Sequence, residues 1–162
     1  MANREFRKLL PSDLNLVLQM NWDFREGFTH ESSAKKFLSN PMNWIYACIQ
    51  DNQIIGFAYG YELNRLDNKG NMLYIHEVGV LDSYQRQGIG YQLLTDLKYL
   101  CKTTGICRIF LFTQKHNTAA CALYEKVGGK KTSDSRDDDI TYFFNDFDDI
   151  SDKLTQILTC SN

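Results

Sequence analysis

Apolar residues follow two different spacings along the chain. Runs rich in β-branched and aromatic residues predict strands at residues 4–10, 43–50, 54–63, 72–81, 106–113 and 140–144. Apolar positions three or four residues apart predict helices at residues 11–26, 32–39, 89–103, 117–127 and 150–158. Hairpins followed by strand–helix–strand units therefore predict a mixed α/β sheet of about six to seven strands, flanked by about four helices.

Turn and cap residues support these boundaries. Asp51–Asn52 predicts a tight hairpin turn, and Ser32 or Ser33 is the expected cap of the second helix. Asn117 is the expected cap of the helix that ends at Gly128. The strand at 106–113 is apolar on both faces, which predicts a central place in the sheet.

Composition narrows the class of protein. The 162 residues and an apolar content of 43% suit one domain, which we expect to span residues 1–162. A net charge of −2 and the lack of a basic stripe argue against nucleic acid or an anionic membrane as partners. The start of the chain lacks the apolar core of a signal peptide. The five cysteines are scattered along the whole sequence and lack metal-ligand spacing. We therefore expect a cytoplasmic protein with reduced thiols and no metal site.

The segment VGVLDSYQRQGIGYQLL, residues 78–94, leads from a strand through a polar turn into a long helix. Backbone N–H groups at a helix start lack intrahelical partners, and the helix dipole adds positive potential there. Gly88 and Gly90 would let a ligand approach closely, and Arg86 adds a positive side chain. The turn predicts an anion site, usually for phosphate, unless the glycines only relieve strain. It matches neither a P-loop nor a dinucleotide fingerprint.

Two motifs carry a family resemblance. The segment 78–90 resembles the Arg/Gln-x-x-Gly-x-Gly signature of the GNAT superfamily of acyl-CoA-dependent N-acyltransferases, with Gln85, Gly88 and Gly90 at the signature positions. NTAACALYEKVGG, residues 117–129, resembles the second motif of that superfamily, except that Gly129 replaces its final aromatic residue. With LYIHEVGV and the acidic close near YFFNDFD, the chain is similar to aminoglycoside 3-N-acetyltransferases over roughly residues 14–148. The resemblance implies a GNAT fold and one acetyltransferase domain.

The resemblance also implies acetyl-CoA as the co-substrate. Its pantetheine arm would lie against Val78, Gly79 and Val80 like an added strand, where a backbone N–H would polarise the thioester carbonyl. Gly79 would mark a bulge or a close approach, which a simple edge bulge also explains. Asn117 would contact the pantetheine arm, or would only cap its helix. The pyrophosphate would lie near Gln85 and on the backbone amides of Arg86, Gln87, Gly88, Ile89, Gly90 and Tyr91.

Direct attack of an amine on the thioester needs a proton acceptor, because an alkyl amine has a reference pKa of about 10.4. Glu77 is the candidate base, since a carboxylate in an apolar strand is costly unless it is paired or functional. Alternatively, Glu77 points outward to solvent or a lysine. Alternation places its neighbour His76 on the opposite face, as a structural histidine. Tyr124 matches the general-acid position of the superfamily, unless it is only a core aromatic residue.

The acceptor is expected to be a small polycation, with an aminoglycoside, and hence antibiotic resistance, as the first choice. Aspartates concentrate after residue 131, where a solvated acidic tail is the alternative explanation. Asp146 is the chosen acceptor-binding acid, and Trp22 and Glu26 of the first helix would line the acceptor site. Phe112 stands where GNAT enzymes that acetylate ribosomal-protein N-termini carry a catalytic Glu, which argues against that subgroup.

Three questions stay open at this point. A protein-lysine or polyamine acetyltransferase is an alternative within the same class. A non-catalytic acetyl-CoA-binding module is the alternative from another class. The last strand and the amphipathic tail at 150–158 predict a homodimer, which we favour, or a tail helix packed on its own domain.

Overall fold

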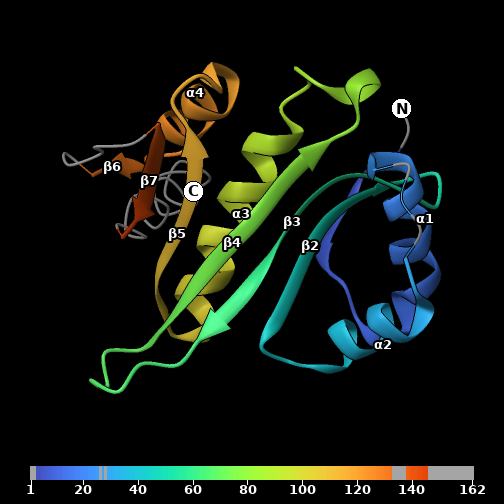
Figure 1. Ribbon diagram of the computed structural model, residues 1–162, viewed down its shortest axis with the longest axis horizontal. Coiled ribbons are helices and arrows are strands. Elements are labelled where there is room, and N and C mark those ends of the chain that lie inside the picture. The colour runs from blue at the N-terminus through green and yellow to red at the C-terminus, as the bar shows by residue number, and fades with distance from the viewer. Residues whose placement is uncertain (1–2, 26, 28, 133–137, 146–162) are drawn as a thin grey trace, which may run out of the picture.

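The computed structural model describes residues 3–25, 27, 29–132 and 138–145, which build a seven-stranded mixed sheet (Figure 1). The strands are β1 (Glu5–Lys8), β2 (Asn43–Gln50), β3 (Gln53–Leu63), β4 (Asn71–Val80), β5 (Ile106–Gln114), β6 (Lys130–Lys131) and β7 (Asp139–Phe144). The helices are α1 (Leu14–Arg25), α2 (Glu31–Ser39), α3 (Ile89–Thr104) and α4 (Thr118–Lys126), with short 3-10 turns at Pro11–Asp13 and Asp82–Tyr84. The strand order is β1-β2-β3-β4-β5-β7-β6, and the predicted fold class is confirmed.

Most local signals in the sequence act as expected. Asp51 and Asn52 both adopt positive φ, as the hairpin between β2 and β3 requires. The Asn117 side chain accepts a hydrogen bond from the Ala120 N–H at 3.2 Å, which caps α4. The cap expected at Ser32 or Ser33 is wrong, because α2 begins at Glu31 with His30 as its N-cap. The two-residue β6 was not predicted, since its two lysines carry no strand pattern.

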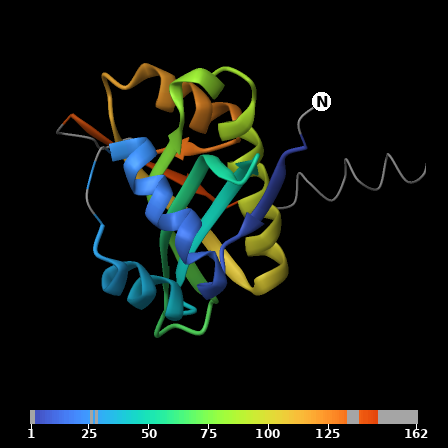
Figure 2. The ribbon, with the colours of Figure 1, turned by 90° about the vertical axis from the view of Figure 1, so that its right-hand side faces the viewer.

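Helices cover the two faces of the sheet unequally. Figure 2 shows α1 and α2 on one face and α3 on the other. The core under α3 and α4 takes buried residues from β2, β3, β4, β5 and β7. The core under α1 and α2 takes its buried strand residues from β2 and β3 alone. On the α1 side, the described residues of β4, β5 and β7 therefore give no buried residue to this core.

Strand β5 shows this asymmetry along its length. Its place inside the sheet, between β4 and β7, was predicted correctly. Ile109 and Leu111 are buried against the α3 side, whereas Phe112 is 54% exposed on the other face. The apolar pattern on both faces of this strand thus does not correspond to burial on both faces.

A β-bulge in β4 determines which way its central residues point. Tyr59 of β3 pairs with Glu77, but the next residue, Gly60, pairs with Ile75, so His76 is the extra residue. The His76 ring lies 5.3 Å from the Tyr59 ring, on the face that also carries Glu77. The expectation that alternation separates His76 from Glu77 is wrong, because one inserted residue cancels the two-residue period.

The bulge also marks the place where β4 parts from β5. Parallel pairing between the two strands runs from Asn71 to Ile75, whose partner is Leu111. Beyond that point, Val78–Val80 pair with β3 alone among the described strands. The β5 side of this part of β4 is thus an open strand edge inside the sheet.

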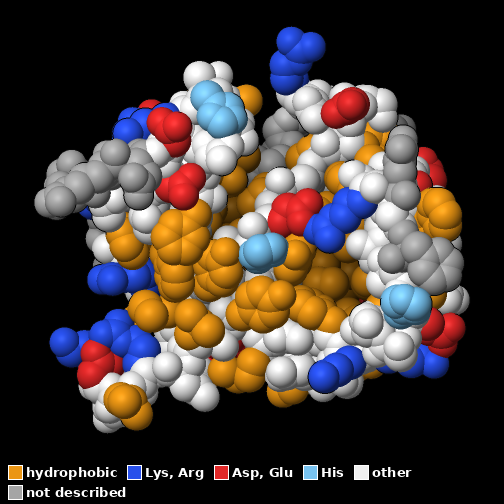
Figure 3. All heavy atoms as spheres, in the orientation of Figure 1, with side chains coloured by type: hydrophobic (Ala, Val, Ile, Leu, Met, Phe, Trp, Pro, Cys, Tyr) orange, Lys and Arg blue, Asp and Glu red, His pale blue; other side chains and the backbone are white. Residues whose placement is uncertain are grey.

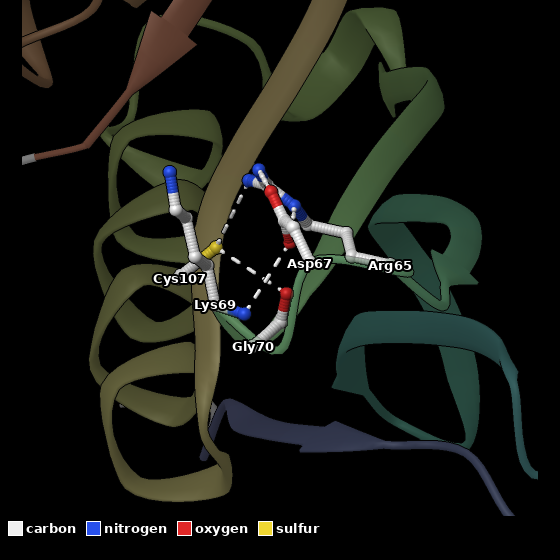
Figure 4. Close-up of polar contacts among 5 residues, drawn as sticks. All are labelled: Arg65, Asp67, Lys69, Gly70 and Cys107. Carbon is white, nitrogen blue, oxygen red and sulfur yellow. Dashed lines mark hydrogen bonds and ion pairs between the residues drawn. The ribbon is translucent and has the colours of Figure 1, made fainter.

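The opposite end of the same strand pair is held closed by the loop that leads into β4 (Figure 4). Arg65 donates to the Asp67 carboxylate and to Cys107 Sγ at the start of β5. Cys107 Sγ in turn donates to the Gly70 carbonyl at 3.6 Å, and the Lys69 N–H donates to Asp67. Because these contacts tie β4 to β5 at one end, the two strands separate only at the other.

Some expectations fall on residues outside this description. The tail at 150–158, on which the homodimer depended, lies outside the described residues, and the homodimer stays a prediction. Among the helices that the structure describes, none combines the length and apolar content needed to cross a bilayer.

The bulge yields a test at Gly60. A Cβ atom there would lie 1.9 Å from the Tyr74 carbonyl oxygen and 2.9 Å from the Ile75 Cα. Because both neighbours are backbone atoms, Gly60→Ala should lower the free energy of unfolding by about 3 kcal/mol, measured by urea denaturation. Gly27→Ala is the matched control, since its Cβ would meet nothing closer than 3.6 Å. Equal stability of the two variants would contradict this account of the bulge.

Candidate functional site

The turn between β4 and α3 contains two residues in left-handed conformation. Arg86 has φ 58° and Gly88 has φ 82°. Gly88 is the N-cap of α3 and makes no side-chain capping hydrogen bond, so the first backbone N–H groups of α3 are not capped by a side chain. A positive φ at an arginine costs free energy, which is typical of a segment held for binding. The N–H groups at this helix start are the feature on which the predicted anion site depends, and that site stays a prediction.

Different contacts hold each of the three motif residues of this turn in place. Gln85 donates through Nε2 to the Val80 carbonyl at 3.2 Å and to Asp82 Oδ1 at 2.8 Å, which holds the turn closed. Gly88 has open space around its missing Cβ, so its conformation is what requires glycine. A Cβ at Gly90 would lie 3.1 Å from Leu123, so this glycine lets α4 approach α3.

An open cavity of about 490 Å³ joins this turn to the free edge of β4 and to α4. It brings together most of the predicted donor-site residues: Val78, Gly79, Val80, Gln85, Arg86, Gly88, Ile89, Gly90, Tyr91, Asn117 and Tyr124. The cavity is lined in addition by residues that the sequence analysis did not assign to the donor site: Tyr84, Ala119, Ala120, Leu123 and Lys126. Lys126 Nζ lies 5.3 Å from the centre of the Tyr91 ring and adds a second cation beside Arg86.

Tyr124 lies where α4 meets the sheet. Its side chain is buried, its ring centre is 5.4 Å from that of Tyr142, and burial raises the pKa of its hydroxyl to about 12. The neighbouring Gly129 N–H donates to the Tyr124 carbonyl at 2.8 Å. A Cβ at Gly129 would lie 2.9 Å from the Phe144 ring, which explains why this chain has glycine there in place of an aromatic residue. Tyr124 is thus both a core residue and a wall of the cavity.

Other predicted residues lie outside this cavity. Gln87 turns away from it, because its side chain bonds to Arg4 and to the Ser83 carbonyl. Gly79 does line the cavity, but it does not mark the bulge, which lies at His76, and its missing Cβ makes room for the Phe57 ring instead. Trp22 is 56% exposed on α1. Glu26 and Asp146 lie outside the described residues.

Glu77 lies on the α1 side of β4 and is held by an unpredicted partner. Arg25, at the end of α1, forms an ion pair with the Glu77 carboxylate, and both side chains are partly exposed. The Arg25 guanidinium also lies 5.8 Å from the centre of the Tyr59 ring. Burial lowers the pKa of Arg25, but the hydrogen bond to Tyr59 and the charge of Glu77 raise it by more. The pKa of Arg25 is therefore above its ordinary value. No motif marks Arg25, because only the packing of α1 on β3 brings it to Glu77.

A smaller cavity, of about 220 Å³, lies next to this ion pair under α1 and α2. Its described walls are mostly apolar and aromatic, and Arg25 is the one charged residue among those that the structure describes: Val17, Met20, Asn21, Arg25, Thr29, Ser33, Ala34, Phe37, Ile45, Tyr59 and Tyr61. The two cavities thus lie on opposite faces of the sheet. The larger one contains the predicted anion site, and the smaller one lies beside the partner of Glu77, Arg25. Figure 3 shows the second region as a hollow lined by hydrophobic side chains, below an acidic and a basic side chain.

Comparison with curated protein sequences finds no match. Solved structures with the same fold include an aminoglycoside acetyltransferase from an uncultured soil metagenomic sample in complex with sisomicin, with a TM-score of 0.74 and 20% identity over 83% of this chain and 91% of that one. NAA60 from Arabidopsis thaliana in complex with acetyl-CoA has a TM-score of 0.67 and 19% identity over 88% and 97%. The ribosomal-protein alanine N-acetyltransferase from Escherichia coli has a TM-score of 0.66 and 22% identity over 88% and 93%. Identities this low show the fold and leave the substrate open.

The family model for the acetyltransferase (GNAT) family matches residues 14–129. This range contains β4, the turn, α3 and α4, and therefore the whole of the larger cavity. The chain belongs to the GNAT family of acetyltransferases, enzymes whose acetyl donor is acetyl-CoA.

Proposed function

We propose that this protein transfers the acetyl group of acetyl-CoA to a primary amine by direct attack, with Glu77 as general base and Tyr124 as general acid. The observation that carries the proposal is the open edge of β4. There one cavity joins unpaired strand backbone, an anion site at a helix start and a protonated tyrosine. Glu77 lies a single residue before the same edge.

The donor half of the proposal uses backbone groups. The pyrophosphate of acetyl-CoA would accept hydrogen bonds from the N–H groups at the start of α3, with Arg86 and Lys126 as neighbouring cations. The pantetheine arm would pair with residues 78–80, which β5 leaves unpaired. A backbone N–H of this edge would then stabilise the negative charge that develops on the thioester oxygen. Asn117 would face the same arm while it caps α4.

Glu77 would accept the proton of the attacking amine, directly or through water. An ion pair with Arg25 holds its side chain in position in the free protein. Because Arg25 is partly exposed at the end of α1, an ammonium group can take its place beside Glu77. The amine nitrogen then bonds to the acetyl carbon, the C–S bond breaks, and the thiolate receives a proton.

Tyr124 would supply that proton. Burial raises the pKa of this tyrosine to about 12. The hydroxyl therefore stays protonated at neutral pH and can donate a hydrogen bond to the developing thiolate. Solvent returns the proton after the product leaves.

For the acceptor, we propose a small polycation, with an aminoglycoside as the first choice. The likeness to a sisomicin-bound aminoglycoside acetyltransferase supports this choice. The acids expected to bind it, Asp146 and Glu26, lie outside the described residues, so their role stays a prediction. A protein acceptor is the second candidate, because NAA60 and the ribosomal-protein enzyme share the fold. Phe112, at the position where the ribosomal-protein subgroup carries its Glu, weighs against that particular subgroup.

Substitution of the two proposed catalytic groups tests the mechanism. Glu77→Gln and Tyr124→Phe should each lower kcat/KM by about a hundredfold or more, because each removes one proton-transfer step. The measurement is thiol release from acetyl-CoA at mildly alkaline pH, with an aminoglycoside containing 2-deoxystreptamine as acceptor. CoA affinity should stay unchanged in Glu77→Gln. Full turnover in both variants would mean that other residues act as the acid and the base, whereas no thiol release by the wild type would leave the protein a binding module.

The pKa of Tyr124 leads to a test by pH. A raised pKa means that the hydroxyl is fully protonated below pH 10 and ionises only near its value of about 12. The wild-type kcat should therefore rise between pH 7 and pH 10, as the amine loses its proton, with no decline caused by Tyr124. A decline with an apparent pKa below 10, present in the wild type and absent in Tyr124→Phe, would contradict the assigned environment.

Arg86 allows charge and backbone strain to be separated. Arg86→Ala and Arg86→Gly both remove the guanidinium, so both should weaken CoA binding by about three- to tenfold in calorimetric titration. Only glycine adopts φ 58° without penalty, so Arg86→Gly should unfold with about 1 kcal/mol more free energy than Arg86→Ala. Lys102→Ala removes a cation from the other end of α3 and should leave CoA affinity unchanged. Equal affinity in all three variants would remove Arg86 from the donor site.

A further inference from the structure

A continuous group of aromatic rings crosses the sheet on the side of α1. Its centre is Tyr74 of β4, whose ring is stacked 5.3 Å from Phe110 and 6.3 Å from Tyr61. Phe112 lies 5.7 Å from Tyr74, and a hydrogen bond of 3.1 Å joins the Tyr74 hydroxyl to His76 Nδ1. We call these residues the aromatic face: Tyr61, Tyr74, His76, Phe110, Phe112 and Phe143.

The aromatic face is open and adjoins the catalytic carboxylate. Its strand residues do not belong to the core under α1 and α2, and Phe112 is 54% exposed. Figure 3 shows hydrophobic side chains gathered over this part of the sheet. His76 precedes Glu77 in the chain, and the bulge turns both side chains to this face. A molecule bound to Glu77 therefore lies beside the aromatic face.

Positive groups already lie over rings on this side of the sheet. The Arg108 guanidinium is 5.3 Å from the centre of Phe143, and that of Arg25 is 5.8 Å from the centre of Tyr59. The members of the aromatic face carry no carboxylate, and neighbouring Glu77 is held by Arg25. The faces of Tyr and Phe rings attract cations through their negative quadrupole. A positively charged group therefore suits this face, which would hold it through the aromatic rings and without a carboxylate.

We propose that the aromatic face is a subsite for a second positively charged group of the acceptor, which it holds by cation–π attraction while the reacting amine lies at Glu77. The inference rests on the proposed function for its occupant, and it holds for any acceptor that carries two ammonium groups. The subsite selects a diamine or polyamine over a monoamine, because only the former fills both positions.

A pair of isosteres tests the proposal without turnover. Choline carries a trimethylammonium group, and dimethylbutanol is its neutral analogue with carbon in place of nitrogen. NMR titration of the aromatic side-chain signals should show choline binding on the order of three- to tenfold more tightly than dimethylbutanol. The signals of Tyr74, Phe110 and Phe112 should shift. Equal affinities would mean an apolar surface only, and no binding of either would overturn the subsite.

Variants link the preference to particular rings. Tyr74→Leu should bring the ratio of choline affinity to dimethylbutanol affinity to one. Tyr74→Phe keeps the ring and should retain the preference for choline. If Tyr74→Leu fails to fold, Phe112→Leu serves in its place, because that side chain is mostly in solvent and its loss should reduce the ratio. Tyr99→Leu removes an exposed ring from α3 and should have no effect. A ratio that persists in both leucine variants of the face would overturn the proposal.

The same experiment separates this proposal from the proposed function and from other occupants of the face. Choline preference in a protein that releases no thiol from acetyl-CoA would retain the subsite and overturn the enzyme proposal. Thiol release without choline preference would retain the enzyme proposal and overturn the subsite. If a second copy covers the face, sedimentation will show a dimer that Tyr74→Leu dissociates, and choline will not be preferred over dimethylbutanol, which overturns the subsite.

Discussion

The parting of β4 from β5 is the constraint on which the rest of this structure depends. A strand pair inside a sheet normally satisfies the backbone hydrogen bonds of both partners. Here the pairing ends at Ile75 and Leu111, and one extra residue at His76 turns the rest of β4 away. The loop around Asp67 and Cys107 keeps the other end closed (Figure 4). The result is a strand edge within the core of the protein, which a ligand backbone can complete.

The bulge also divides the chemistry between the two faces of the sheet. Tyr124 and the start of α3 reach the open edge from the side of α3 and α4. Glu77 and Arg25 meet on the side of α1. In the proposed mechanism, an acetyl group at this edge would therefore receive the acid, Tyr124, from one face and the base, Glu77, with the amine from the other. Donor and acceptor would then occupy separate cavities.

Departures from ordinary folding rules gather at this site. Arg86 has a left-handed backbone, and Phe112 exposes a large apolar side chain in the middle of the sheet. Gly60 is needed because the bulge brings the Tyr74 carbonyl against its Cα. Each feature costs stability by itself, and such costs in natural proteins are concentrated where binding or catalysis requires them. The buried core under α3, in contrast, follows the expected pattern of apolar residues.

The sequence by itself determined the local elements and the donor side of the site. Asn117, Gly128 and Asp51–Asn52 act through contacts within a few residues, so their effects could be predicted from spacing and residue type. The turn with Gly88 and the position of Tyr124 were likewise evident from two motifs. Tertiary structure decided the acceptor side, because its features depend on pairing between distant segments. The partner of Glu77 comes from α1, and the face of His76 comes from a register shift against Gly60. Strand alternation in one segment contains no information on either, since a bulge exists only in relation to the neighbouring strand.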